Sequence, residues 1–266
     1  MMCRFLESPI KNFCFWLGVS LLPSICSANM LVYPMDVTVG TGQGSAASLR
    51  VYSKSDATQY VQVSVQRVVD PATSTEHEIL APRTGADAVV VSPTKFVLPA
   101  GGSRLVRVIA LGMPSEEALY RVYLTPVAAP TDADAPQVAS SVKSSVDFSL
   151  VWAPLVRVLP KLSAPALTVS RDGVLSNTGN VRLGIIRAAA CSSESDEASC
   201  AWKQVERSVY PQQTYRLDAA PSLSPPTVWR VRYRAGDGQS PQQAVLPGSG
   251  APYASGVHTE GSVNAD

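Results

Sequence analysis

Short segments in which apolar and polar residues alternate recur along the first half of this 266-residue chain, with turn residues between them. A period of two places successive side chains on opposite faces of a β-strand. The predicted strands are residues 31–39, 48–55, 58–70, 88–93, 95–98, 103–111 and 117–127. Strands of this length and spacing favour an immunoglobulin-like β-sandwich.

The alternating pattern begins again after residue 161, so a second, smaller β-domain is expected. Its predicted strands are residues 166–170, 173–177, 181–189, 214–218, 227–235 and 242–247. Residues 177–180 (NTGN) are predicted to form a turn, because Asn and Gly tolerate positive φ. The expected organisation is a first domain at 29–160, a second at 161–247, and a Gly/Ser-rich disordered tail at 248–266.

Composition narrows the class of protein. Hydrophobic residues make up 45% of the chain and charged residues 16%, which is typical of a globular protein. The 21 Pro and 17 Gly favour short strands and turns over long helices. The formal net charge of +1 implies no general attraction to nucleic acid or to anionic lipid.

The first 28 residues are predicted to be a secretory signal peptide. Arg4 and Lys11 accompany an apolar run of suitable length, small residues follow it, and cleavage after Ala28 fits. A membrane anchor is the alternative, but the run is short for a span and Pro23 interrupts it. A lipoprotein signal ending at Cys26 is disfavoured because a bulky residue precedes it. The protein is therefore expected to be exported, with no membrane insertion.

The cysteines fit an oxidising compartment. Cys3, Cys14 and Cys26 lie in the predicted signal peptide, which leaves Cys191 and Cys200. An even remainder in an exported protein indicates one disulfide, here closing an acidic hairpin tip. A zinc site is disfavoured, because no His or further Cys lies nearby in the sequence.

Residues 144–160 hold the last predicted strand of the first domain, which is unusually apolar on one face. That face is formed by Val146, Phe148, Leu150 and Trp152. Arg157 follows five residues after the last of them, on the opposite face. Such a strand suits capture of an extended peptide, with main-chain pairing for affinity and a guanidinium for the terminal carboxylate. The alternative is an ordinary core strand whose Arg157 extends to solvent.

No constellation of residues predicts catalysis, a metal or a cofactor. The glycine-rich residues 40–45 follow a predicted strand, but a phosphate-binding loop would need a helix next, so a hairpin turn is expected. His77 and His258 lie away from any recognisable nucleophile. The run from Glu76 to Glu78 is expected to be a solvated loop. We therefore expect a protein that is not an enzyme and has no cofactor.

Several motifs in a fixed order are more specific than any one of them. Residues 91–101 show the spacing Val-x-Pro-x-x-Phe-x-Leu-x-x-Gly, with a basic residue on the following strand and then EEALYRVYLTPV at 116–127. Together with VYSKSDATQY, PLVRVLP and NTGNVRLG, they resemble the periplasmic pilus chaperones of the chaperone–usher pathway. Within that family the chain looks most like the alternate chaperones that serve class 5 fimbriae. The resemblance spans residues 31–246.

The resemblance implies two immunoglobulin-like domains set in an L, located in the periplasm. It implies that the last strand of the first domain completes pilin subunits or adhesins that lack a strand, which are then delivered to an outer-membrane usher. The donor side chains would be Val146, Phe148, Leu150 and Trp152. Arg157 would anchor the C-terminal carboxylate of the pilin. An exposed apolar strand also favours self-association, so a self-capping homodimer is a further hypothesis.

One departure from the family pattern concerns the first strand. Many members carry a second anchoring cation there, soon after a proline, whereas here Asp36 stands near that position. The second cation is then either absent, with Arg157 acting alone, or supplied from elsewhere, with Lys54 as the candidate.

Two other classes of function remain as alternatives. A structural pilin or adhesin module would have an N-terminal donor extension and an incomplete sandwich, whereas the first domain here holds a full set of predicted strands. An exported carbohydrate-binding or hydrolytic sandwich would need an aromatic cluster or a catalytic constellation, and the sequence offers no recognisable one.

Overall fold

The computed structural model describes residues 29–40, 44–129, 150–217, 228–236 and 239–247. The predicted signal peptide at 1–28 and the predicted tail at 248–266 lie outside the described residues, as do Val146 and Phe148. In the described residues, no helix is long and apolar enough to cross a membrane.

Two sheets pack face to face in the first domain. One has the strand order β1 (Met30–Tyr33), β3 (Ala46–Ser53), β8 (Ser103–Ala110) and β6 (Val89–Ser92). The other has the order β2 (Asp36–Val39), β10 (Leu155–Val158), β9 (Ala118–Val127), β4 (Gln59–Val69) and β5 (His77–Leu80), and β7 (Lys95–Leu98) also pairs with β4.

The alternation in the sequence explains how these sheets pack. In β3, Leu49 and Val51 are buried while Arg50 and Tyr52 between them are exposed, so one face of the strand enters the core. Strand β9 behaves in the same way and places Tyr120 and its even-numbered neighbours in the core. The inner faces of both sheets contribute to one hydrophobic cluster.

The second domain is also a two-layer sandwich. Its smaller sheet has the order β11 (Leu167–Val169), β12 (Val174–Asn177) and β15 (Thr214–Arg216). The larger sheet has the order β14 (Cys200–Val209), β13 (Leu183–Cys191), β16 (Val228–Ala235) and β17 (Gln242–Pro247). A separate core forms around Trp229, and a single 3-10 turn, η1 (Glu197–Ser199), precedes β14.

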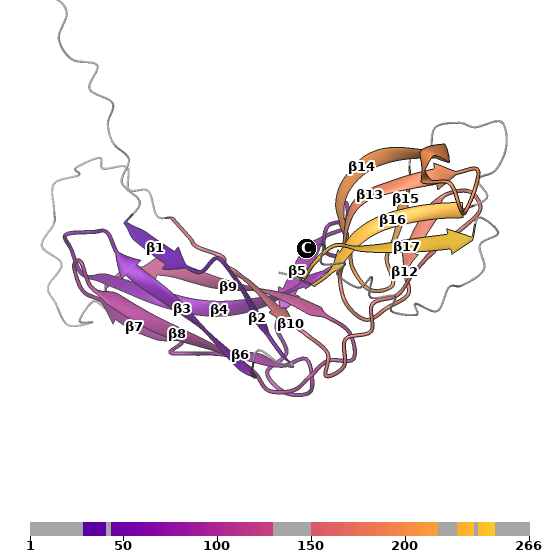
Figure 1. Cartoon of the computed structure of the whole chain (residues 1–266). Helices are drawn as coiled ribbons and strands as arrows, with labels where there is room; N and C mark the ends of the chain where they lie inside the picture. Colours follow the sequence, from indigo (N-terminus) through magenta and orange to yellow (C-terminus); the bar gives the residue numbers. More distant parts are fainter. Residues whose placement is uncertain (1–28, 41–43, 130–149, 218–227, 237–238, 248–266) are drawn as a thin grey trace, which may run out of the picture.

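The two sandwiches meet end to end at an angle, as Figure 1 shows. The all-β architecture of two immunoglobulin-like domains in an L is therefore confirmed. Strand β10 is the last strand of the first sandwich and runs into the chain segment that crosses to the second. The β4–β5 hairpin of the first domain also lies beside the second domain (Figure 1).

The structure changes two of the predicted local segments and confirms a third. Residues 31–39 form two strands in different sheets, β1 and β2, on either side of Pro34. The glycine-rich turn closes with the Gly40 N–H donating to the Gly44 carbonyl at 2.8 Å, and a strand, not a helix, follows. The prediction of a loop around His77 was wrong, because His77–Leu80 is strand β5, which pairs antiparallel with β4.

The two remaining cysteines form a disulfide across the β13–β14 hairpin. Cys191 and Cys200 face each other in the strand register, with their Cα atoms 4.1 Å apart. The predicted pairing is confirmed, and it closes the hairpin at the end of the second domain that carries η1.

Candidate functional site

The chain leading into β10 has one edge bound to the sheet and the other edge open. The Trp152 N–H and C=O both bond Leu124 of β9, and the Pro154 carbonyl accepts from the Val122 N–H at 3.0 Å. Because strand groups alternate in direction, the N–H and C=O of Val151 and Ala153 point away from β9. No described residue pairs with them on that side.

The open edge ends where β2 begins. The Leu155 N–H donates to the Met35 carbonyl at 2.9 Å, and β2 then runs parallel to β10 as far as Val158. Strand β1, which precedes β2, pairs with β3 in the opposite sheet, so no strand of the described residues covers the upstream part of this edge. Backbone pairing sites are therefore available over residues 150–154 of the described chain.

The two described donor candidates differ in exposure. Leu150 is 51% exposed, and its neighbour Val151 is also exposed. Trp152 is partly buried and packs against the first-domain core, with its Nε1 buried and without a hydrogen-bond partner among the described residues. Leu150 is thus the described candidate that is accessible to a partner. Val146 and Phe148 lie outside the described residues.

Arg157 lies at the foot of this edge, on the outer face of the sheet. In the register it is paired with Leu119 of β9 and with Thr38 of β2. Its side chain is only 12% exposed, so the alternative in which it extends to solvent does not hold. Trp152 and Val156 face the core, which agrees with the predicted opposite parity of the apolar face and the cation.

Two carboxylates contact the Arg157 guanidinium. Its Nη2 donates to Asp36 Oδ2 at 2.7 Å, and its Nε lies 4.0 Å from Glu117 Oε1. Asp36 is 44% exposed, whereas the Glu117 side chain is 1% exposed. The cation therefore has an outer acidic partner near solvent and an inner one in the interior.

Glu117 also contacts the second domain. Its Oε2 accepts from the Arg182 N–H at 2.7 Å. Burial raises the pKa of Glu117, and the hydrogen bond from Arg182 with the charges of Arg182 and Arg157 offsets part of that rise. Burial likewise raises the pKa of Tyr210, which lies near both arginines. The anchor candidate is thus part of a charged cluster at the junction of the domains.

Lys54 lies elsewhere. It follows β3, and its N–H donates to the Asn29 carbonyl at 2.9 Å, beside the start of β1. Strand β3 starts just after the bridge between Gly40 and Gly44, beside the end of β2, and Lys54 follows its far end, about 25 Å along the strand. The structure does not bring Lys54 to Arg157, and the residue near Arg157 on the first strand is the acid Asp36.

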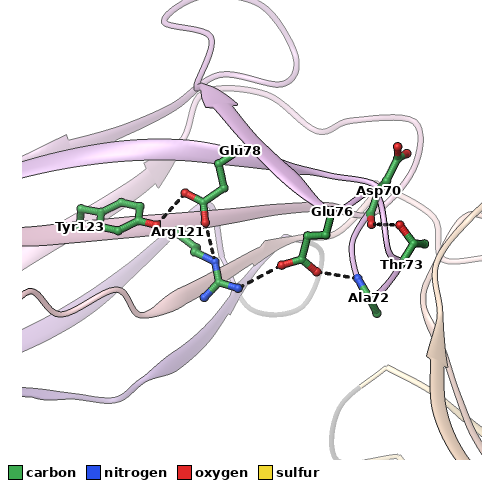
Figure 2. A network of polar contacts seen from close by, with 7 residues as sticks. All are labelled: Asp70, Ala72, Thr73, Glu76, Glu78, Arg121 and Tyr123. Carbon is green, nitrogen blue, oxygen red and sulfur yellow. Dashed lines mark hydrogen bonds and ion pairs between the residues drawn. The ribbon is translucent and has the colours of Figure 1, made fainter.

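A second polar network lies on the same outer face, between β9 and β5. Arg121 Nε lies 2.8 Å from Glu78 Oε1, and its Nη2 lies 3.3 Å from Glu76 Oε1. The Tyr123 hydroxyl donates to Glu78 at 2.7 Å, and Glu76 accepts from the Ala72 N–H, as Figure 2 shows. These acids are engaged by protein groups, and the described residues contain no cluster of three or more metal-ligating side chains.

Sequence reasoning identified Arg157 and the edge but missed the other members of the junction. Glu117, Arg182 and Tyr210 come from three separate parts of the chain. Glu117 opens the motif EALYRVYLTPV, and a carboxylate next to a buried strand was a signal of its own. For Arg182 and Tyr210, no signal in the sequence indicated a contact with the first domain.

Comparison with known proteins gives two relatives, both fimbrial proteins of Escherichia coli. No protein-family model matches the chain. A CS1 fimbrial subunit of Escherichia coli is 33% identical over 205 residues, which cover 75% of this chain and 84% of that protein. A CFA/I fimbrial subunit of Escherichia coli is 28% identical over 205 residues, covering 76% and 84% respectively.

Two solved structures match over nearly their whole length. The class 5 fimbriae chaperone CfaA has a TM-score of 0.69 and 26% identity, over 82% of this chain and 97% of that one. A structure described as "Chaperone-tip adhesin complex is vital for synergistic activation of CFA/I fimbriae biogenesis" has a TM-score of 0.67 and 25% identity, over 83% and 100%.

The architecture distinguishes a chaperone from a structural pilin. The two relatives carry the word subunit in their names, but the match to CfaA extends through both sandwiches of a chaperone. A chaperone of this kind is not an enzyme. The order of motifs, the two-domain fold and the relatives agree, and the chain belongs to the class 5 fimbrial chaperones of the chaperone–usher pathway.

Proposed function

We propose that this chaperone acts in the periplasm, after removal of residues 1–28, and binds fimbrial subunits through the open edge at residues 150–154. The edge lends a strand to the bound pilin, Arg157 holds the pilin's C-terminal carboxylate, and the complex is delivered to an outer-membrane usher. The same exposed edge would pair with a second copy in the free protein, which gives a self-capping homodimer.

The observation that carries the proposal is the pair of outward-pointing backbone groups at Val151 and Ala153 beside an exposed Leu150. A partner strand placed there would satisfy these groups and cover the apolar side chain. One of the matched structures is described as a chaperone–tip adhesin complex, which supports an incomplete fimbrial protein as the partner.

The expected binding free energy and the strand register both agree with strand donation to a pilin. Burial of the proposed donor side chains other than Trp152, which packs in the chaperone's own core, contributes about 5–9 kcal/mol before ordering costs. A charge-assisted bond to Arg157 adds about 1.5–3 kcal/mol. Its position fixes register, since a slip by one residue would turn the donor side chains away from the pilin.

Replacement of Leu150 by Asp tests strand donation. The tagged chaperone is purified from the periplasm of its host, and co-purifying pilins are identified and quantified by mass spectrometry. We expect Leu150→Asp to reduce the amount of captured pilin at least about tenfold, because a buried leucine contact is lost and a carboxylate is placed against an apolar groove.

The matched control is Leu111→Asp. Leu111 is 55% exposed, close to the value for Leu150, but follows β8 in the other sheet. Its substitution should leave capture unchanged. Equal loss in both variants, or no loss in either, would reject residues 150–154 as the binding edge.

A further inference from the structure

Asp36 occupies the side of Arg157 that a ligand carboxylate would need. Its Oδ2 accepts a hydrogen bond from Arg157 Nη2 at 2.7 Å, and the Asp36 side chain is 44% exposed whereas that of Arg157 is 12% exposed. Asp36 is the first residue of β2, directly after Met35, whose carbonyl accepts from Leu155. Its side chain can therefore turn away without any change in strand pairing.

Glu117 cannot leave in the same way. It is buried, and its second carboxylate oxygen is held by the Arg182 N–H from the other domain. The inner acid lies 4.0 Å from Arg157 Nε, beyond hydrogen-bond distance, so it contributes electrostatic attraction and no directed bond. The outer acid is thus the partner that can be exchanged.

We propose that Asp36 is an intramolecular competitor for the carboxylate site of Arg157, and that it lowers the affinity of this chaperone for the C-terminal carboxylate of its pilins. This inference rests on the proposed function. An incoming carboxylate has to displace Asp36 or remain close to a like charge, and either costs binding free energy. Pilin binding then depends more on strand pairing along residues 150–154, and the carboxylate end is released more readily.

The test uses two synthetic peptides with the sequence of the C-terminal strand of the pilin that co-purifies with the chaperone. One peptide ends in a free carboxylate and the other in a carboxamide. Fluorescence anisotropy gives the dissociation constant of each for the full-length mature chaperone. The measured quantity is the preference ratio, the constant for the amide divided by the constant for the acid.

We expect Asp36→Asn to raise the preference ratio about fivefold over the wild-type value, the scale of one partly exposed ion pair. Arg157→Ala should bring the ratio to about one, and adding Asp36→Asn to it should change nothing further. Asp56→Asn is the matched control, because Asp56 is an exposed acid in the same domain near the distant end of β3 and should leave the ratio unchanged.

The possible results distinguish the competing role of Asp36 from the anchoring role of Arg157. A ratio that falls in Asp36→Asn would show that Asp36 supports Arg157 and does not compete with its ligand, which overturns the inference and keeps the anchor. An unchanged ratio also overturns it. A ratio of one in both the wild type and Asp36→Asn would overturn the anchoring role of Arg157 itself. Circular dichroism of each variant confirms that loss of the ion pair leaves the fold intact.

Discussion

At the level of single residues, the sequence indicated the cation but not its environment. Arg157 could be singled out because its parity differs from that of the apolar positions before it. Of its acidic partners, Asp36 was noted only through the family resemblance and Glu117 was not noted at all, since both are distant in sequence and meet Arg157 through the pairing of β2, β9 and β10. The side-chain partners of a cation depend on tertiary contacts that strand periodicity does not encode.

Glu117 makes the stability of the junction depend on pH in a definite direction. Its pKa in the folded protein is raised above the ordinary value of 4.5, so the folded state binds the proton more tightly than the unfolded state. The contribution of Glu117 to the free energy of unfolding is therefore fully present below about pH 4.5. It decreases as pH rises through the raised pKa. The slope for one proton cannot exceed about 1.4 kcal/mol per pH unit.

Glu117→Gln tests this sign. Free energies of unfolding are measured by urea titration between pH 4 and pH 8 for both proteins. The wild-type value minus the variant value should decrease as pH rises from about 4.5, because glutamine cannot titrate. A difference that instead increases with pH would mean that the attraction of Arg157 and Arg182 outweighs burial.

At the level of elements, the alternation of apolar and polar residues did not predict two polar edge strands, β5 and β14. Strand β5 holds His77 and Glu78 and lies at the edge of its sheet, fixed by the network around Arg121 (Figure 2). Strand β14 is also an edge strand, and most of its residues are exposed or only partly buried. Edge strands avoid apolar alternation because it would promote aggregation, so periodicity detects central strands better.

The turn predicted at residues 177–180 is a bend at Gly179 and Asn180 that follows Asn177, the last residue of β12, and its cause differs from the predicted one. None of these four described residues has a positive φ. The buried Asn177 side chain instead donates to the Val181 and Val209 carbonyls, and the Gly179 and Asn180 N–H groups donate to Ala166 and Ala164. Glycine is required because the backbone of the interdomain segment passes directly against it.

Gly179→Ala should therefore destabilise the second domain strongly. A Cβ at this position would lie under 3.0 Å from the backbone of Ala164 and of Ala166, and neither can move without breaking the turn. We expect a loss of about 2–4 kcal/mol in the free energy of unfolding, measured by urea denaturation.

Gly184→Ala is the control for this substitution. A Cβ at Gly184 would meet its nearest atom at 3.6 Å, an ordinary contact, and its φ is not positive. It should change stability by less than about 1 kcal/mol. Similar losses at both positions would mean that β-domain glycines are generally required, and would contradict the close-approach explanation.

At the level of the whole molecule, the sequence predicted two sandwiches, while their L arrangement followed from family resemblance. Alternation and turn spacing report how each domain folds, because each has its own core. The junction of the domains holds a small apolar cluster surrounded by polar contacts. In the cluster, Val68, Leu119 and Leu155 of the first domain pack around Tyr210 of the second. Such a cluster carries no periodic signal in the sequence.

Polar contacts between the domains surround that cluster. Arg207 Nη2 donates to the Ala72 carbonyl at 3.1 Å, and Gln213 Nε2 donates to the Pro71 carbonyl at 3.0 Å. Both acceptors lie in the β4–β5 hairpin, which the Arg121 network holds in place (Figure 2). The angle between the domains is therefore set by the hairpin contacts, the apolar cluster and the hydrogen bond from the Arg182 N–H to Glu117.

Tyr210→Ala should loosen the two domains without unfolding either. The substitution removes the only second-domain side chain of the described apolar cluster, so the domains lose about 2–4 kcal/mol of mutual stabilisation. Small-angle X-ray scattering should show a larger radius of gyration, and calorimetry should resolve two unfolding transitions where the wild type has more closely coupled ones. Tyr233→Ala is the control, since Tyr233 is buried in the second-domain core and its loss should lower only that domain's transition. A Tyr210→Ala protein with unchanged scattering and coupled unfolding would show that the polar contacts between the domains hold the L without the apolar cluster.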